Sequence, residues 1–235
     1  MRNRITATVV AAAASVALLG GSGQALAADT APAAPSQLTV DAYKTWLKRA
    51  PGGGPTLKAF SRLPVVKQRA FVGYLQNARV FKAFGVTQTG AIPSKAKTKT
   101  VRYNKDVTFT STTVAASRTA KSTKTVSLSV TATERIFDIP VTSATTTLSY
   151  ETGKGGLITG KGRKAGHKGT NFNAAFTVKA DATKFAPEAN MLDAVTHWTA
   201  TPRFKSAGTK PIKKLQVLTG LGDHGTATTF RTVGS

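Results

Sequence analysis

The sequence contains no cysteine, and its 235 residues include only 10 aspartates and glutamates against 33 lysines and arginines. Without cysteine the chain has no disulfide framework, no zinc–thiolate or iron–sulfur site and no thiol nucleophile. Three histidines and few carboxylates leave little material for metal ligands or acid–base pairs. We therefore expect no cofactor and no metal, and a protein that is not an enzyme.

Long apolar runs are missing after the N-terminal region. There, Arg2 and Arg4 precede an apolar run from Ile5 to Leu19, and Ala25-Leu26-Ala27 has the small-x-small pattern of a cleavage site. The run is shorter than the roughly 20 residues that a membrane-spanning helix needs. These features predict a secretory signal peptide over residues 1–27 and a secreted protein, extracellular or associated with the cell wall.

Aromatic residues are also few, at 7%, but a hydrophobic content of 40% is enough for a folded protein. Residues 28–38, rich in Ala and Pro, predict a flexible spacer. Residues 39–86 predict about three or four short helices around an aromatic core: Thr39 is a suitable N-cap, and apolar residues then recur at helical spacing. Residues 87–97, with Gly90 and Pro93, suggest a linker.

From residue 98 to residue 235 the composition shifts to threonine and serine, and apolar and polar residues alternate. Val107–Thr110, Val126–Thr131 and Phe176–Lys179 show this alternation, which is typical of antiparallel strands with one buried face. The turn signals between them predict roughly six to eight strands. The expected fold is α+β, with a small N-terminal helical module followed by a Thr-rich antiparallel β-sandwich or open barrel.

Three features together resemble a known group of proteins. They are the Ala25-Leu26-Ala27 export signal, the Phe71–Gln76 helix after Leu63-Pro64, and the Asn171-Phe172-Asn173 strand start after a basic turn. In this layout the chain is similar to small secreted actinobacterial proteins of uncharacterised role. The resemblance implies export and a β-rich fold, and it assigns no catalytic residue.

Two stretches concentrate the basic residues. The first, rich in glycine, contains Lys154, Lys161, Arg163, Lys164, His167 and Lys168; the second, beside Trp198 and Phe204, contains Arg203, Lys205, Lys210, Lys213 and Lys214. Glycines let backbone N–H groups approach an anion that the cations neutralise, and cations beside aromatic rings can hold a polymer. The alternative is structural: a solvated hairpin loop, and lysines that protect a sheet edge.

A nucleotide cofactor is not expected. Residues 155–161 match the start of a phosphate-binding loop, but Gly162 stands where Ser or Thr is needed to hold magnesium. We expect the basic residues to bind an anionic polymer such as teichoic acid, anionic polysaccharide or extracellular DNA, without catalysis. An anionic membrane surface is a further partner to consider, because a net charge of +23 attracts polyanions irrespective of their sequence.

Two alternative functions stay open. The Thr-rich stretch from Val107 to Tyr150 also suits the inserting hairpins of a membrane-active or pore-forming toxin. A secreted hydrolase with an unrecognised site is the other, for which His197 and His224 are the residues to test. Asp193 and His197 are unsuited to act as a pair on a strand, where residues four apart are separated by roughly 13 Å.

Overall fold

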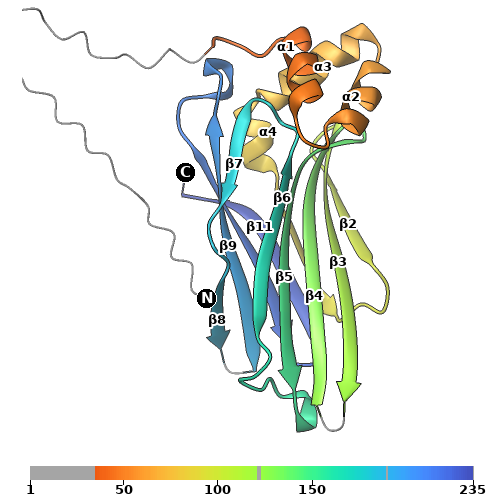
Figure 1. Ribbon diagram of the computed structural model, residues 1–235, viewed down its shortest axis with the longest axis vertical. Helices are drawn as coiled ribbons and strands as arrows, with labels where there is room; N and C mark the ends of the chain where they lie inside the picture. The colour runs from red at the N-terminus through yellow and green to blue at the C-terminus, as the bar shows by residue number, and fades with distance from the viewer. Residues whose placement is uncertain (1–34, 121–122, 189, 235) are drawn as a thin grey trace, which may run out of the picture. The chain divides into compact units, whose positions relative to one another are not determined.

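The computed structural model describes residues 35–120, 123–188 and 190–234, which belong to one compact unit (Figure 1). The expected signal peptide over residues 1–27, and the expected spacer as far as residue 34, lie outside the described residues. The described chain is mostly β, with four short helices. No helix in this part of the chain is both long and apolar enough to cross a membrane.

The helices form where the sequence predicted them, and they are α1 (Val40–Arg49), α2 (Gly54–Ser61), α3 (Val65–Leu75) and α4 (Ala78–Ala83). Thr39 caps α1, as expected, because its Oγ1 accepts a hydrogen bond from the N–H of Ala42 at 3.2 Å. Asn77 caps α4 in the same way through the N–H of Arg79. The Pro51–Pro55 run separates α1 from α2.

Eleven strands form two antiparallel sheets within the described residues. The strands are β1 (Val86–Ala91), β2 (Lys97–Arg102), β3 (Val107–Ala120), β4 (Thr123–Ile136), β5 (Ile139–Thr152), β6 (Lys164–Asn171), β7 (Phe176–Ala180), β8 (Lys184–Glu188), β9 (Met191–Pro202), β10 (Ile212–Leu221) and β11 (Gly225–Val233). One sheet has the order β2-β3-β4-β5-β6, and the other has the order β1-β11-β10-β9-β7, with β8 also beside β9.

The strand count exceeds the roughly six to eight predicted. Strand β1 occupies much of the segment that suggested a linker, because its six residues pair with β11 from the far end of the chain. The long strands β3, β4 and β5 cover the Val107–Tyr150 stretch and pair with one another over most of their length. Two further short elements are the 3₁₀ turns η1 (Lys154–Gly156) and η2 (Lys205–Ala207).

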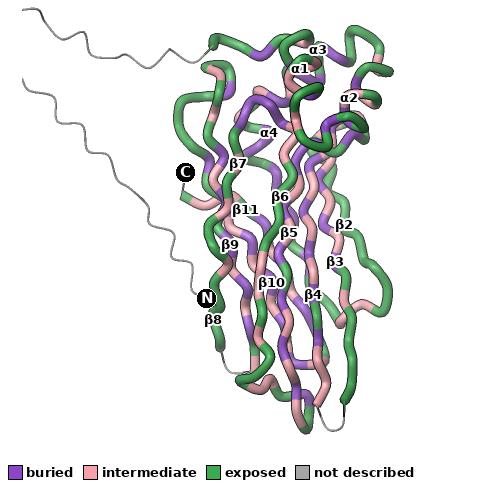
Figure 2. The backbone as a smooth tube through the Cα atoms, viewed as in Figure 1, coloured by how far each residue is buried: buried purple, intermediate pink, exposed green. Residues whose placement is uncertain are grey.

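The two sheets lie face to face in a sandwich-like arrangement. Burial alternates along their central strands, as Figure 2 shows, so every second side chain points between the sheets. Gln216 of β10 joins them: its Oε1 accepts from Thr146 Oγ1 of β5 at 3.0 Å, and its Nε2 donates to the carbonyl of Ala144 at 3.0 Å. Trp198 Nε1 donates to the same Gln216 oxygen at 3.1 Å.

The four helices share a buried core with one end of the strands. Tyr43, Phe60 and Phe71 form an aromatic cluster with ring centroids 5.0 to 5.7 Å apart, and Phe81 of α4 stacks on Phe176 of β7 at 4.9 Å. These side chains belong to one hydrophobic cluster with residues of both sheets. Tyr43 also donates its hydroxyl to the carbonyl of Phe172 at 2.9 Å. The helical residues and the strands are thus parts of one core.

Candidate functional site

The first basic stretch forms the connection from β5 to β6 and continues along β6. Lys154 lies in η1, Lys161 lies in the loop that follows, and both are exposed. Lys164, His167 and Lys168 are exposed on β6, which is the edge strand of its sheet. The phosphate-loop-like residues 155–161 therefore lead into a strand rather than into the helix that such a loop requires.

Arg163 lies at the start of this edge, just before β6. Its side chain is only partly exposed, and its Nε is buried with no hydrogen-bond partner in the described structure. His167 is held more firmly, because its Nδ1 lies 3.0 Å from Thr183 Oγ1 and its ring meets Trp198 edge to face. The six predicted residues of this stretch are thus spread along one loop and one strand.

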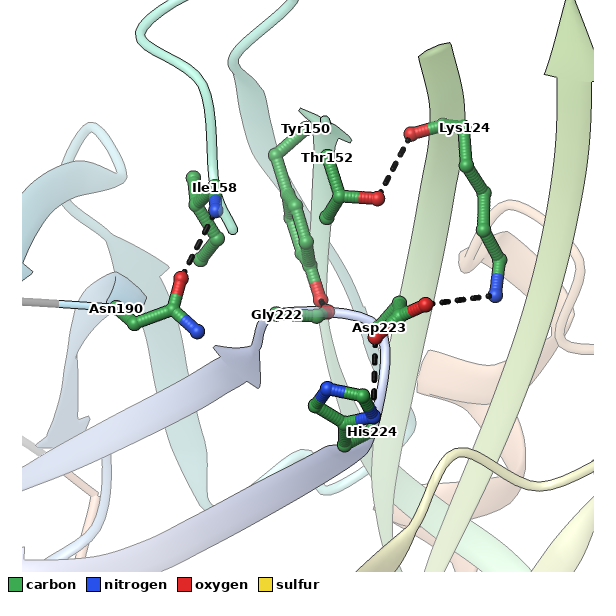
Figure 3. Close-up of polar contacts among 8 residues, drawn as sticks. All are labelled: Lys124, Tyr150, Thr152, Ile158, Asn190, Gly222, Asp223 and His224. Atoms are coloured by element: carbon green, nitrogen blue, oxygen red, sulfur yellow. Dashed lines mark hydrogen bonds and ion pairs between the residues drawn. The ribbon is translucent and has the colours of Figure 1, made fainter. Parts of the chain in front are cut away.

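The loop is bound to the turn between β8 and β9 at the end of the sandwich, and it lies against the turn between β10 and β11 (Figure 3). Asn190 accepts a hydrogen bond from the N–H of Ile158 at 2.8 Å, and Tyr150 donates to the carbonyl of Gly222 at 2.6 Å. Gly156 has a φ of +73°, and a Cβ there would collide with the Asp223 carboxylate. Only glycine therefore allows the loop to lie so close to this turn.

Asp223 is the centre of the ion pairs in the described part of the chain. Its Oδ2 lies 3.6 Å from Lys124 Nζ, and its Oδ1 lies 3.0 Å from His224 Nδ1 (Figure 3). No other lysine, arginine or histidine among the described residues comes within 4.0 Å of a described carboxylate. The basic residues of the loop and of β6 therefore present charges that this part of the protein does not neutralise.

The second basic stretch lies at the other end of the sheets. Arg203 and Lys205 follow the end of β9, and Lys213 lies near the start of β10; all three are exposed. Strand β10 has ten residues and leads away from this cluster to the Asp223 turn, a distance of roughly 30 Å. The second cluster is therefore far from Lys154 and Lys161, which lie near the Asp223 end of the sheets.

Lys214 lies in the interior, so the prediction that it binds the polymer is wrong. Only 1% of the residue is exposed. Its Nζ donates to the carbonyl of Phe84 at 2.6 Å, to Thr232 Oγ1 at 2.9 Å and to the carbonyl of Lys82 at 3.3 Å. Strand alternation explains this position, because Ile212, Lys214 and Gln216 all point between the sheets.

Burial dominates the electrostatics around Lys214. Desolvation lowers the pKa of Lys214 to about 7, although the carboxylate of Glu134 opposes the shift. Three phenylalanine rings lie with their centroids 5.3 to 5.6 Å from its Nζ. This environment could not be predicted from local sequence, since the backbone acceptors come from the end of α4, about 130 residues earlier in the chain.

Glu134 of β4 is a second ionisable residue in the interior, and the sequence patterns did not predict its burial. It is fully buried, and neither of its carboxylate oxygens has a hydrogen-bond partner in the described structure. Desolvation raises the pKa of Glu134 to about 7, while Thr142 and Lys214 act in the opposite direction. Glu134 also contributes to a raised pKa of Tyr43, of which burial is the larger cause.

The residues considered for hydrolysis are arranged as follows. Asp193 and His197 lie on the outward face of β9, and no ion pair joins them. Among the described residues no three His, Asp or Glu side chains are grouped closely enough to hold a metal ion. The side chain of His224 is 73% exposed and contacts Asp223. The other hydrogen bonds drawn in Figure 3 join backbone and side-chain groups of neighbouring strands and turns and do not involve His224.

No protein-family model, curated protein or solved structure matches this chain.

Proposed function

We propose that this protein is a secreted, non-catalytic binder of anionic polymers of the bacterial envelope or its surroundings. Teichoic acid, anionic polysaccharide and extracellular DNA are the polymers of this kind. The observation that carries the proposal is the unneutralised charge: lysines and arginines outnumber acidic residues by more than three to one, and in the described residues only Lys124 among them is ion-paired.

Such a charge distribution favours polymers over small anions. Each contact between a cation and a polymer charge releases condensed counterions, so affinity grows with the number of contacts and falls steeply with salt. The exposed cations of the β5–β6 connection and of β6 are held on a strand edge and a fixed loop. Holding them in place lowers the conformational entropy lost on binding. These residues are therefore the first candidates for contacts with the polymer.

Cosedimentation with bacterial cell walls tests the proposal. The purified protein would be mixed with walls that are intact or stripped of anionic polymers, across a series of salt concentrations. Binding that requires the anionic polymers and weakens with salt supports the proposal. Binding to stripped walls that resists salt, or no binding to either preparation at low salt, overturns it.

A matched pair of variants tests whether polymer binding depends on the β6 region or on net charge alone. One variant carries Lys154→Gln, Lys161→Gln, Lys164→Gln and Lys168→Gln; the control removes the same charge at the exposed residues Lys48, Lys58, Lys105 and Lys179. The first variant is expected to bind more weakly than the control and to have a smaller salt slope, by roughly 0.7 to 0.9 per lost contact. Equal losses in the two variants would contradict a role for this region.

A further inference from the structure

The outward face of the five-stranded sheet carries an ordered set of hydroxyl groups. Residues paired across neighbouring strands point to the same side of a sheet. Thr112, Thr131 and Thr145 stand in one row across β3, β4 and β5, and Lys168 continues the row on β6. The Oγ1 atoms of Thr131 and Thr145 lie 2.9 Å apart, so these two hydroxyls of the row are hydrogen-bonded to each other.

A groove of about 410 Å³ crosses this face next to that row. Its floor is formed by two further rows, in which Ser129 pairs with Thr147 and Ser127 pairs with Ser149. Gly166 and Lys164 complete the two rows on β6. Because these side chains are small, the face is hollowed at this point, and Ser127 and Thr147 are exposed residues. Ser127 Oγ lies 3.1 Å from Ser149 Oγ, and Thr147 Oγ1 donates to the carbonyl of Gly166 at 3.3 Å, so each hydroxyl keeps capacity for one further partner.

The charges around the groove are almost all positive. Lys164 lines the groove, and Lys168 lies on the same face one row away. Arg118 of β3 and Glu151 of β5 stand in the row that borders the groove beyond Ser127 and Ser149, and Glu151 is the one outward acidic residue along the described lengths of β3 to β6. A partner that fills the groove therefore meets hydroxyl groups set among apolar atoms on its floor, and mainly cations at its edge.

This combination favours an anionic polysaccharide over a single-stranded nucleic acid or a lipid surface. Binding to single-stranded nucleic acid relies on aromatic side chains on which the bases stack. The outward positions of β3 to β6 in the described chain carry no aromatic residue. Of the large apolar side chains that line the groove, Val114 is exposed whereas Leu128 and Leu148 are buried, and one exposed side chain is too little for insertion into lipid. Hydroxyl-bearing side chains, in contrast, both donate and accept hydrogen bonds, as sugar hydroxyls require.

We propose that this groove binds an extended anionic polysaccharide. Its sugar hydroxyls exchange hydrogen bonds with Ser127, Ser149 and Thr147, and its carboxylate or phosphate groups pair with Lys164 and Lys168. The proposal rests on the proposed function and gives it a surface and a partner class. It also separates two contributions to binding: charge, which any polyanion satisfies, and hydrogen bonds in the groove, which sugar hydroxyls can make.

The test fills the groove without changing the charge. The variant Ser127→Leu/Thr147→Leu removes two exposed hydroxyls and adds bulk, and Thr89→Leu/Thr177→Leu makes the same change at exposed positions on the other sheet. The probes are polygalacturonate, inorganic polyphosphate, neutral dextran and an oligothymidylate. For the groove variant we expect affinity for polygalacturonate to fall at least about tenfold, which is 1.4 kcal/mol, and affinity for polyphosphate to stay the same.

The outcomes distinguish this proposal from the proposed function. If the protein binds polygalacturonate and polyphosphate but the groove variant binds both as before, the groove assignment is overturned and polyanion binding stands. If the protein binds neither at low salt, polyanion binding itself fails. Equal affinity for dextran, or a groove-dependent preference for oligothymidylate, also overturns the assignment. Circular dichroism melts confirm folding, and Ser127→Ala/Ser149→Ala, which adds no bulk, repeats the test if the leucine variant does not fold.

Discussion

Glu134 and Lys214 place two ionisable groups in the interior, each with a pKa of about 7. Between pH 4.5 and about 7 the folded chain keeps a proton on Glu134 that the unfolded chain has released, so stability falls as the pH rises. Between about pH 7 and 10.5 the unfolded chain keeps a proton on Lys214 that the folded chain has lost, so stability rises again. We therefore expect a minimum of stability near neutral pH from these two groups.

Two single substitutions are expected to remove, one at a time, the fall in stability below about pH 7 and the rise in stability above it. Glu134→Gln flattens the decline between pH 4.5 and 7, which is on the order of 3 kcal/mol for a shift of this size. Lys214→Met flattens the rise above pH 7, although it also leaves the carbonyl of Phe84 without its donor. Urea unfolding at several pH values measures both effects. A profile that each variant leaves unchanged would show that neither group titrates in the folded interior.

At the scale of strands, β10 has no room for a side chain at Gly220, because the ring of Tyr150 packs against the backbone there. A Cβ there would overlap the ring of Tyr150, which is fully buried and donates to the carbonyl of Gly222 at 2.6 Å. Gly220→Ala is therefore expected to destabilise the fold by about 1 to 3 kcal/mol through overpacking. Denaturant unfolding measures the change in stability.

Gly73 of α3 provides the matched control. It lies inside a helix, and a Cβ there would meet no atom within 4 Å. Gly73→Ala is expected to stabilise the protein by up to about 1 kcal/mol, because alanine has the higher helix propensity. A destabilisation of the same size in both variants would mean that Tyr150 is not the cause of the effect at Gly220.

Local sequence patterns predicted where helices and strands form better than they predicted which strands pair with one another. The Thr39 cap and the Pro51–Pro55 run defined α1, and period-two alternation identified β3, β4 and β5, because these signals lie within a few residues. Strand β1 was missed because its pairing partner β11 is some 140 residues away, and Gly90 and Pro93 suggested a loop. Alternation did not indicate that Lys214 points inward, because Lys214 and Gln216 are polar whereas their neighbour Leu215 is apolar, and the α4 carbonyls that hold Lys214 are a tertiary feature.

At the scale of the whole molecule, a net charge of +23 with so little pairing in the described part implies repulsion between like charges in the folded state. Raising NaCl from about 20 mM to about 500 mM shortens the Debye length from roughly 20 Å to roughly 4 Å. We therefore expect the melting temperature to rise with salt over this range. A short polyphosphate is expected to raise it at low salt, because a ligand that binds only the folded chain adds about 2.7 kcal/mol at 100 times its Kd.

The Gln variant at Lys154, Lys161, Lys164 and Lys168 makes this prediction specific to the β6 region. Removing four like charges reduces the repulsion, so the variant is expected to melt at a higher temperature than the parent protein in low salt and to respond less to NaCl. It is also expected to lose most of the stabilisation by polyphosphate, because the contacts that bind the polymer are gone. Differential scanning calorimetry with and without polyphosphate measures both effects. Lower stability of the variant in low salt, with undiminished stabilisation by polyphosphate, would show that these lysines neither repel one another nor bind the polymer.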